Sequence, residues 1–138
     1  MSAYAKPLPR ARKIDEPYWE ATLAGELRIQ HCLDCDEWWF PPSEFCPNCL
    51  GHAFEWARAS GSGVIWSRII MHQLYFKAFA DDLPYNVVWV KLDEGPMVTA
   101  NVVGTDNEGI EIGARVKVVF DPVTETVTLP RFRIVGGK

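Results

Sequence analysis

From residue 64 onward, apolar and polar side chains alternate in short segments that are separated by turn residues. The segments are rich in Val, Ile and aromatic residues, which is typical of β-strands. We expect five strands, over residues 64–71, 86–92, 97–103, 115–121 and 127–135. The sequence Asp93-Glu94-Gly95-Pro96 predicts a tight turn between the second and third strands. Five short strands without a long helix favour a small barrel, and the OB-fold is the commonest five-stranded barrel.

The segment before the cysteines follows a helical pattern. Asp15 is suited to the N-cap of a short helix and Pro17 to its first turn. Apolar residues at four-residue spacing predict one apolar helix face, formed by Trp19, Leu23 and Leu27. Gly25 is expected to end the helix. Residues 27–29 then begin an alternating pattern that predicts a short strand leading into the cysteines.

The length and the turn residues predict a division of the chain. Its 138 residues suffice for one ordinary domain or two very small ones. The sequence Ser60-Gly61-Ser62-Gly63 is typical of a turn or hinge. We therefore expect a flexible arm over residues 1–14, a helix with a cysteine module over residues 15–60, and a barrel over residues 61–138.

Charge is unevenly distributed along the chain. Four basic residues precede the first acidic residue, whereas the whole chain has a net charge of −4, so residues 14–138 carry −8. An acidic body repels a phosphate backbone, which disfavours nucleic-acid binding. The sequence has no apolar run long enough for a membrane span and no apolar stretch near its start that is typical of a secretory signal. We therefore expect a cytoplasmic protein that does not contact membranes.

Four cysteines form two Cys-x-x-Cys pairs separated by ten residues: Cys32, Cys35, Cys46 and Cys49. Each pair supplies two thiolates, and the four together complete the tetrahedral shell that Zn²⁺ prefers. Four sulfur ligands leave no open coordination position, so we expect a structural zinc; iron in the same ligand set is the alternative. His31 and His52 lie beside the pairs and are expected not to be ligands.

Three aromatic residues, Trp38, Trp39 and Phe40, lie between the two cysteine pairs. A segment this short cannot bury all three rings within itself. We expect at least one ring to pack against the helix or the barrel.

The sequence contains no recognisable catalytic set. It has no Gly-x-Ser-x-Gly elbow, no phosphate-binding P-loop and no His-Glu-x-x-His motif. His72 follows the first barrel strand, but no nucleophile or partner base can be assigned to it by spacing. We therefore assign no catalytic residue.

Two groups of residues are candidates for binding. The first is aromatic and lies in or beside the loop over residues 73–85, which either folds onto the barrel or docks on a partner: Tyr75, Phe76, Phe79 and Tyr85. The second is basic and lies on barrel strands, with Arg115 and Lys117 on one strand face and Arg131 and Arg133 on another. These basic residues form either an ordinary solvated surface or a binding patch for a phosphate-bearing, nucleotide-like group.

The order of these features resembles one family, the domain-of-unknown-function family thirty-five. The resemblance covers about residues 15–135 and rests on ordered motifs: Trp19, Gly25-Glu26-Leu27, the cysteine pairs, Pro41-Pro42, Trp56, Ser60-Gly61-Ser62-Gly63, Leu83-Pro84-Tyr85, Glu94-Gly95-Pro96 and Ile112-Gly113. It implies a mainly β chain with an N-terminal helix, a rubredoxin-like zinc ribbon and a C-terminal OB-fold. Only the four cysteines carry over residue by residue.

The resemblance also implies an acyl-CoA context. Members of this family look like non-catalytic companions of thiolase-like enzymes, including aldolases that shorten steroid side chains. The expected partner is therefore a thiolase-like enzyme in a hetero-oligomer, a heterotetramer by preference, with acyl-CoA as a ligand of the complex. The ribbon and helix would dock on the partner, and the barrel would help to hold the acyl-CoA site.

Three other functions stay open. The partner could instead be a hotdog-fold enoyl-CoA hydratase. The OB-fold and ribbon are also used by single-stranded nucleic-acid binding modules, which stack bases on aromatic rings in a positive groove. A self-sufficient enzyme is the last alternative, and the absence of a nucleophile and base disfavours it.

Overall fold

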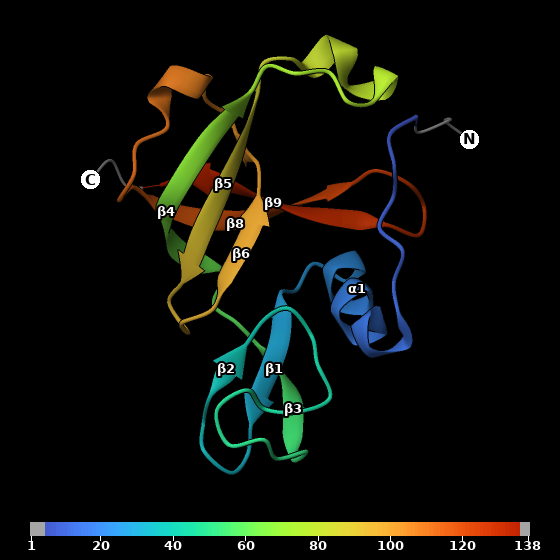
Figure 1. The fold of residues 1–138 in the computed structure, drawn as a ribbon, viewed down its shortest axis with the longest axis vertical. Coiled ribbons are helices and arrows are strands. Elements are labelled where there is room, and N and C mark those ends of the chain that lie inside the picture. Colours follow the sequence, from blue (N-terminus) through green and yellow to red (C-terminus); the bar gives the residue numbers. More distant parts are fainter. Residues whose placement is uncertain (1–4, 136–138) are drawn as a thin grey trace.

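The computed structural model describes residues 5–135, which form two sheets and one α-helix (Figure 1). The smaller sheet contains β1 (Arg28–Cys32), β2 (Trp38–Trp39) and β3 (Phe54–Arg58), in the order β2-β1-β3 with antiparallel pairing. It carries the cysteine module. We call residues 28–58 the ribbon.

The larger sheet is the predicted barrel. Its strands are β4 (Ser62–Met71), β5 (Tyr85–Leu92), β6 (Met97–Ala100), β7 (Val102–Val103), β8 (Arg115–Pro122) and β9 (Thr128–Ile134). They are hydrogen-bonded in the order β6-β5-β4-β8-β9-β7. Gly95, in the predicted turn between β5 and β6, has a φ of 122° and donates its N–H to the Leu92 carbonyl at 2.9 Å. The mainly β architecture and the barrel are thus confirmed.

One predicted strand, over residues 97–103, is divided in the structure. β6 pairs antiparallel with β5, whereas β7 pairs parallel with β9, and Asn101 lies between them. The side chain of the buried Asn86, near the start of β5, holds the start of β7 in place. Its Oδ1 accepts from Val102 N at 2.7 Å, and its Nδ2 donates to Val102 O at 3.0 Å. The prediction of one continuous strand was wrong, because the chain changes neighbours there to close the barrel.

The helix α1 (Glu16–Leu23) follows a short 3₁₀ turn, η1 (Lys13–Asp15). Asp15 occupies the N-cap position, but its carboxylate binds the Arg12 guanidinium at 2.8 and 2.9 Å instead of capping the helix. This Arg12 hydrogen bond also lowers the pKa of Asp15. Gly25 has a φ of 81° just after the helix, which confirms it as the helix terminator.

The predicted apolar face of the helix was wrong. Leu23 is 49% exposed, and Leu27 lies beyond the end of the helix, although it is buried in the core. The buried helix residues are instead Tyr18, Ala21 and Thr22. Four-residue spacing suggested the stripe, but the helix has only eight residues and the chain leaves it before Leu27.

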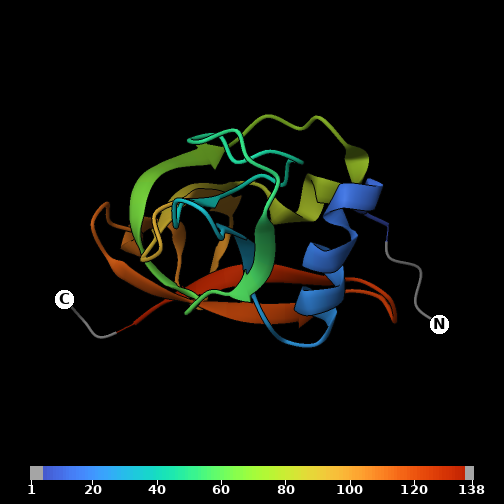
Figure 2. The same ribbon diagram turned by 90° about the horizontal axis from the view of Figure 1, so that it is seen from below.

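The helix packs between the ribbon and the barrel, where it contacts β1, β8 and β9 (Figures 1 and 2). Tyr18 and Leu27 belong to the same buried cluster as the barrel interior, which contains Ile65, Val88, Val90, Val116 and Phe132. Burial raises the pKa of Tyr18. The ring centroid of Phe40 lies 5.1 Å from that of Tyr18, which confirms that a ring from between the cysteine pairs packs on the helix.

Two further 3₁₀ turns lie in loops of the barrel: η2 (Lys77–Asp82) between β4 and β5, and η3 (Asn107–Gly109) between β7 and β8. From the arm over residues 1–14, Lys6 reaches the η2 loop, with its Nζ 2.6 Å from Asp82 Oδ2. The described part of this arm, residues 5–14, and the η2 loop come together near one end of the barrel (Figure 1). The division into three segments remains a prediction.

Candidate metal centre and ligand cleft

The four cysteines form one compact cluster of sulfur atoms. Their Sγ atoms all lie within 4.8 Å of one another, and the pairs Cys32–Cys49 and Cys35–Cys46 are each 3.6 Å apart. A tetrahedral zinc with metal–sulfur distances of about 2.3 Å needs sulfur atoms about 3.8 Å apart. The cluster therefore fits a zinc ion, and the sulfur ligands that the spacing predicted come together.

Backbone amides support the sulfurs in the same way at both pairs. Asp34 N points to Cys32 Sγ at 3.4 Å, and Asn48 N points to Cys46 Sγ at 3.4 Å. After each pair one residue has a positive φ, 67° at Asp36 and 64° at Leu50, and this turns the chain around the sulfurs. Each pair therefore forms a knuckle whose N–H groups stabilise thiolate charge.

One side chain reaches across the cluster. Asn48 Nδ2 donates to Cys35 Sγ at 3.4 Å. This hydrogen bond is the main reason why the pKa of the Cys35 thiol is lowered to about 7, since it stabilises the thiolate. The Asn48 hydrogen bond thus favours the thiolate form of Cys35. At Cys49 the Gly51 amide acts in the same direction, but contact with Cys32 and burial outweigh it and raise the pKa of that thiol to about 12.

Neither neighbouring histidine belongs to the cluster. His31 lies 3.2 Å from Glu55 Oε2 and 3.4 Å from Asp36 Oδ1, and its ring stacks on Trp38 with centroids 4.5 Å apart. His52 is exposed and packs against Phe45. Four sulfurs close a tetrahedral shell, so the centre offers structure rather than a reacting position.

A cleft of about 630 Å³ lies at the end of the barrel that carries η2. It brings together three of the six predicted contact residues, namely Phe79, Tyr85 and Arg131. The rings of Phe79 and Tyr85 lie 5.5 Å apart, and Lys6 Nζ lies 5.7 Å from the Phe79 ring centroid. Aromatic residues and charged groups therefore line one wall of the same cleft.

The charges in this cleft are paired. Arg131 donates from Nε to Asp121 Oδ2 and from Nη1 to Asn101 Oδ1, both at 2.7 Å. Lys6 pairs with Asp82, as described above. Two cations and two carboxylates thus line the cleft, which suits a neutral, polar ligand better than a free phosphate.

Three asparagines in the cleft, Asn86, Asn101 and Asn107, were not predicted from the sequence. Asn101 Nδ2 donates to Asn86 O at 2.5 Å, and Asn107 Nδ2 donates to Pro84 O at 3.0 Å. Isolated asparagines in turn-rich segments are usual, so only their tertiary placement reveals them. Their side-chain amides hydrogen-bond to the backbone, to one another and to Arg131, so they fix the cleft wall.

The other predicted contact residues lie outside the cleft lining. Tyr75 and Phe76, at the start of the η2 loop, are 70% and 58% exposed. Arg133 makes no ion pair with any residue among 5–135, and its guanidinium lies against Gly104. Of the remaining basic strand residues, Arg115 forms two hydrogen bonds with Asp93, and Lys117 donates to Ser60 O at 2.8 Å.

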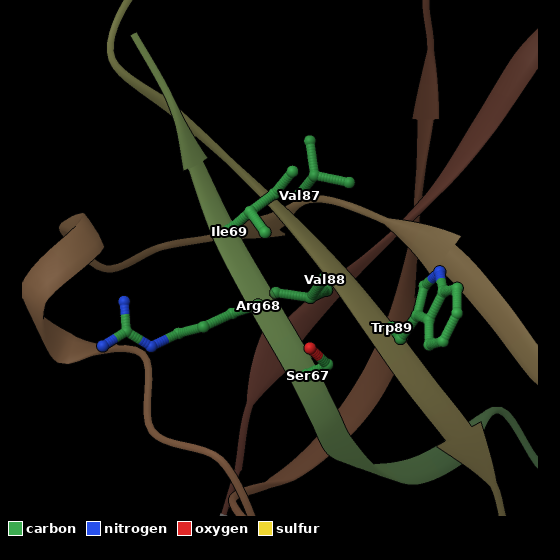
Figure 3. Close-up of a pocket in the computed structure, with 6 residues that line it drawn as sticks. All are labelled: Ser67, Arg68, Ile69, Val87, Val88 and Trp89. Atoms are coloured by element: carbon green, nitrogen blue, oxygen red, sulfur yellow. The ribbon is translucent and has the colours of Figure 1, made fainter.

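The outer face of β4 and β5 carries exposed apolar residues. Trp66, Ile69 and Trp89 are each about half exposed, at 50%, 53% and 48%. Figure 3 shows Ile69 beside Val87 on adjacent strands, Trp89 projecting from β5, and Arg68 extending in the other direction; the hollow between them is about 250 Å³. Aromatic patches of this kind are typical of protein contacts.

The part of the chain that the structure describes contains no catalytic constellation. His72 is exposed, and within residues 5–135 no side chain hydrogen-bonds to it. Among the described residues, the four cysteines are the one group of at least three potential metal ligands. None of the described helices is long and apolar enough to span a membrane.

Comparison with known proteins identifies the family. A family described as "ChsH2, rubredoxin-like zinc ribbon domain" matches residues 19–55, and one described as "ChsH2, C-terminal OB-fold domain" matches residues 56–121. Two proteins called DUF35 domain-containing scaffold protein, from Methanothermobacter thermautotrophicus and Methanocaldococcus jannaschii, are 38% and 32% identical to the chain. Each alignment spans 68% of this chain, and it covers 71% and 67% of the relatives. This chain belongs to the DUF35 family.

Other similar proteins extend the comparison. A solved chain described as "Ltp2-ChsH2(DUF35) aldolase" is 32% identical with a TM-score of 0.83, over 92% of this chain and 98% of that one. A DUF35 protein of unknown function from Sulfolobus solfataricus shares the fold at 12% identity and a TM-score of 0.60. A probable enoyl-CoA hydratase alpha subunit from Thermomonospora curvata is 33% identical over 128 residues, but the match spans only 40% of that subunit. The resemblance and the fold predicted from the sequence are confirmed.

Proposed function

We propose that this DUF35 chain is a non-catalytic accessory subunit of an acyl-CoA-processing complex. The observation that carries the proposal is its likeness to the solved Ltp2-ChsH2(DUF35) aldolase chain over nearly the whole of both chains. Two relatives are called scaffold proteins, in line with a role in assembly. The closed sulfur cluster, together with the lack of a catalytic set among residues 5–135, agrees with a chain that positions groups rather than reacting with substrate.

The partner that we propose is a thiolase-like enzyme of the aldolase type, assembled with this chain as a heterotetramer. Steroid side-chain cleavage is the reaction class that follows from the family resemblance. The ribbon would dock on this partner, since it exposes three large apolar side chains around the knuckles: Leu33, Phe45 and Leu50. The outer face of β4 and β5 supplies a second apolar contact area.

We further propose that the cleft beneath η2 contacts the pantetheine arm of an acyl-CoA. That arm is neutral, flexible and carries two amides, which suits paired charges, asparagine side chains and the rings of Phe79 and Tyr85. Tyr75 and Phe76 lie on the same loop and would meet the partner at the cleft entrance. Arg133, without an ion pair among the described residues, is the basic strand residue best suited to reach a CoA phosphate.

A hotdog-fold enoyl-CoA hydratase is the second candidate partner. It is favoured by the identity to the probable hydratase alpha subunit, in which the matching region is a minor part of a longer chain. Both candidates keep the same role for this chain. They differ in the reaction that the assembled complex would perform.

The accessory role is tested by purifying the tagged chain from its native host and identifying proteins that remain bound in stoichiometric amount. We expect a thiolase-like enzyme, with a hydratase as the outcome that selects the second candidate. Recovery of the bare chain or of nucleic acid would contradict the proposal. An oligonucleotide affinity that rises as salt falls, and that Arg131→Ala with Arg133→Ala abolishes, would support a nucleic-acid module instead.

A further inference from the structure

The arm before the helix forms one wall of the cleft beneath η2. Residues 5–12 contain no helix or strand, yet Lys6 and Pro7 line the cleft. Every other lining residue lies at position 79 or later, in the barrel or its loops. In Figure 1 the arm runs from the start of α1 toward the η2 loop. One side of the cleft is therefore closed by a segment that is not part of the barrel.

The contact of the arm with the η2 loop is weak. Lys6 Nζ lies 2.6 Å from Asp82 Oδ2 and 5.7 Å from the Phe79 ring centroid. The side chains of Lys6 and Asp82 are 29% and 41% exposed, so water and salt screen their attraction. An exposed cation over an aromatic ring adds only a similar, small stabilisation. This end of the arm can therefore leave the cleft and return at low cost.

The other end of the arm is held more firmly. The Arg12 guanidinium donates to both carboxylate oxygens of Asp15, at 2.8 and 2.9 Å, and to Pro42 O at 3.2 Å. Bidentate pairs of this kind fix the orientation of both groups. Residues 7–11 are exposed and form no hydrogen bond with any other residue among 5–135. We call residues 6–11 the strap.

Two prolines stiffen the strap. Pro7 and Pro9 fix their own φ angles, and each disfavours helical backbone at the residue before it, so Lys6 and Leu8 are biased toward extended conformations. A stiff segment with one firm end and one weak end moves about the firm end. Arg12 is thus the hinge of the strap, and the Lys6–Asp82 ion pair is its closure.

We propose that the strap opens and closes the cleft: it swings away when Lys6 leaves Asp82, and it closes again over a bound ligand. With the strap in place the cleft has a volume of about 630 Å³, within the range of small-molecule sites, so closure leaves room for a ligand. A neutral ligand does not compete for either charge, so the ion pair can re-form beside it. The identity of that ligand, a pantetheine arm, rests on the proposed function, whereas the movement of the strap does not.

The first test follows the strap without a ligand. The full chain, loaded with zinc and labelled with ¹⁵N, is measured by the ¹H–¹⁵N nuclear Overhauser effect, which falls where the backbone moves on the picosecond to nanosecond timescale. We expect values at residues 8, 10 and 11 that are typical of an ordered loop. Lys6→Gln should lower them to those of a free chain end, and high salt should lower them in the natural chain. Arg10→Gln removes the same charge from the strap without removing a tether, so it is the matched control and should leave them unchanged.

A charge exchange tests whether the ion pair itself closes the strap. Lys6→Asp and Asp82→Lys should each free the strap, because each places like charges together. The double variant restores an opposite pair and should recover the values of an ordered loop. Strap values that do not change in Lys6→Gln, or a double variant as mobile as the single variants, would overturn the proposal.

The second test measures how well the closed strap retains a ligand. Pantetheine is titrated into the natural chain and into Lys6→Gln while the amide signals of Tyr85 and Asn101 are followed by NMR. The affinity should be about two- to fivefold lower in Lys6→Gln, as expected for the loss of one partly exposed ion pair, and the change should lie in a faster dissociation. Arg10→Gln should bind pantetheine like the natural chain. Equal affinity and dissociation rate in Lys6→Gln and the natural chain would show that the strap does not retain the ligand.

The two tests separate this inference from the proposed function. If pantetheine binds neither chain while the charge exchange restores the strap, closure of the cleft stands and the proposed ligand fails. If pantetheine binds but the strap is equally mobile in Lys6→Gln and the natural chain, the proposed ligand stands and the strap proposal fails.

Discussion

The ribbon and the barrel are built from different sources of stability. The ribbon has a small buried cluster of its own, Cys32, Trp39 and Cys46, of which two members are candidate metal ligands, and its Ile29 joins the barrel core. The barrel buries a continuous set of β-branched and aromatic side chains that includes Ile65, Val88 and Phe132. We therefore expect the ribbon to need a metal ion to stabilise its own small core, whereas the barrel is stabilised by the removal of apolar surface from water.

Because of this difference, we expect metal removal to affect mainly the ribbon and core truncation to affect mainly the barrel. Metal removal should unfold the ribbon and release the helix contacts to β1, while the barrel strands keep their pairing. A cavity in the barrel core should lower the free energy of unfolding without changing the number of metal ions bound per folded chain. The predictions below test this separation, beginning with the largest effect.

Loss of one ligand should have the largest effect. Cys46→Ala leaves three sulfurs and should abolish stoichiometric zinc binding, because the binding free energy of a structural zinc is about 10–16 kcal/mol and is coupled to folding. Bound metal measured by mass spectrometry, together with NMR signals of the ribbon, checks this. His52→Ala, beside the knuckles but outside the cluster, is the control and should keep one zinc per chain. Full zinc retention in Cys46→Ala would contradict the assigned ligand set.

Truncation in the barrel core should come next. Phe132 is 1% exposed, so Phe132→Ala should lower the free energy of unfolding by about 3–5 kcal/mol. Val135→Ala, on a residue 38% exposed near the same end of the chain, should change it by less than about 0.5 kcal/mol. Urea unfolding followed by circular dichroism gives both values. A ribbon that loses zinc in Phe132→Ala while the chain is still folded would break the separation.

The barrel closure should be sensitive to a single amide. Asn86→Ala removes both hydrogen bonds to Val102 and leaves the buried N–H and carbonyl of Val102 unpaired. The free energy of unfolding should fall by about 2–3 kcal/mol. Asn107→Ala removes an exposed hydrogen bond to Pro84 O and should lower the free energy of unfolding by less. Hydrogen exchange at Val102 and Val103 gives a local readout. Equal stability of Asn86→Ala and the natural chain would remove Asn86 from the account of closure.

The smallest effect concerns the pH dependence of metal binding. The Asn48 hydrogen bond lowers the pKa of Cys35 to about 7, so it keeps this ligand in the thiolate form at lower pH. Asn48→Ala should raise that pKa and weaken zinc affinity about tenfold near pH 7, because protons then compete for Cys35. The loss should disappear above about pH 9, where the thiol ionises in both forms. Competition with a chromophoric chelator at the two pH values measures it, and a pH-independent loss would contradict the mechanism.

The sequence predicted those parts of the molecule that depend on local patterns. Alternation with a period of two predicted the barrel strands, and the spacing of the cysteines predicted the cluster of four sulfur atoms, because both rules act over a few residues. The apolar helix face failed because Leu27 left the helix for the core. The division at Asn101 was missed because it depends on which strand lies beside residue 102.

The two cavities could not be predicted from the sequence, because each is lined by residues that lie far apart along the chain. The cleft beneath η2 joins residues from 6 to 131, and a smaller cavity joins residues 36–40 to residues 94–96. No local signal marks Trp39 Nε1 or Glu94 Oε1 as unpaired, since this follows only from the surrounding tertiary structure.

The central claim is that this chain assists another enzyme's reaction without catalysing one itself. The most direct test is reconstitution with the thiolase-like protein recovered from the host, with turnover of an acyl-CoA substrate measured for each chain alone and for the purified complex. The account predicts no turnover by this chain alone and at least a tenfold higher rate for the complex than for the partner, since positioning contributes orders of magnitude. Turnover by this chain alone, or a partner whose rate is unchanged by its presence, would contradict it.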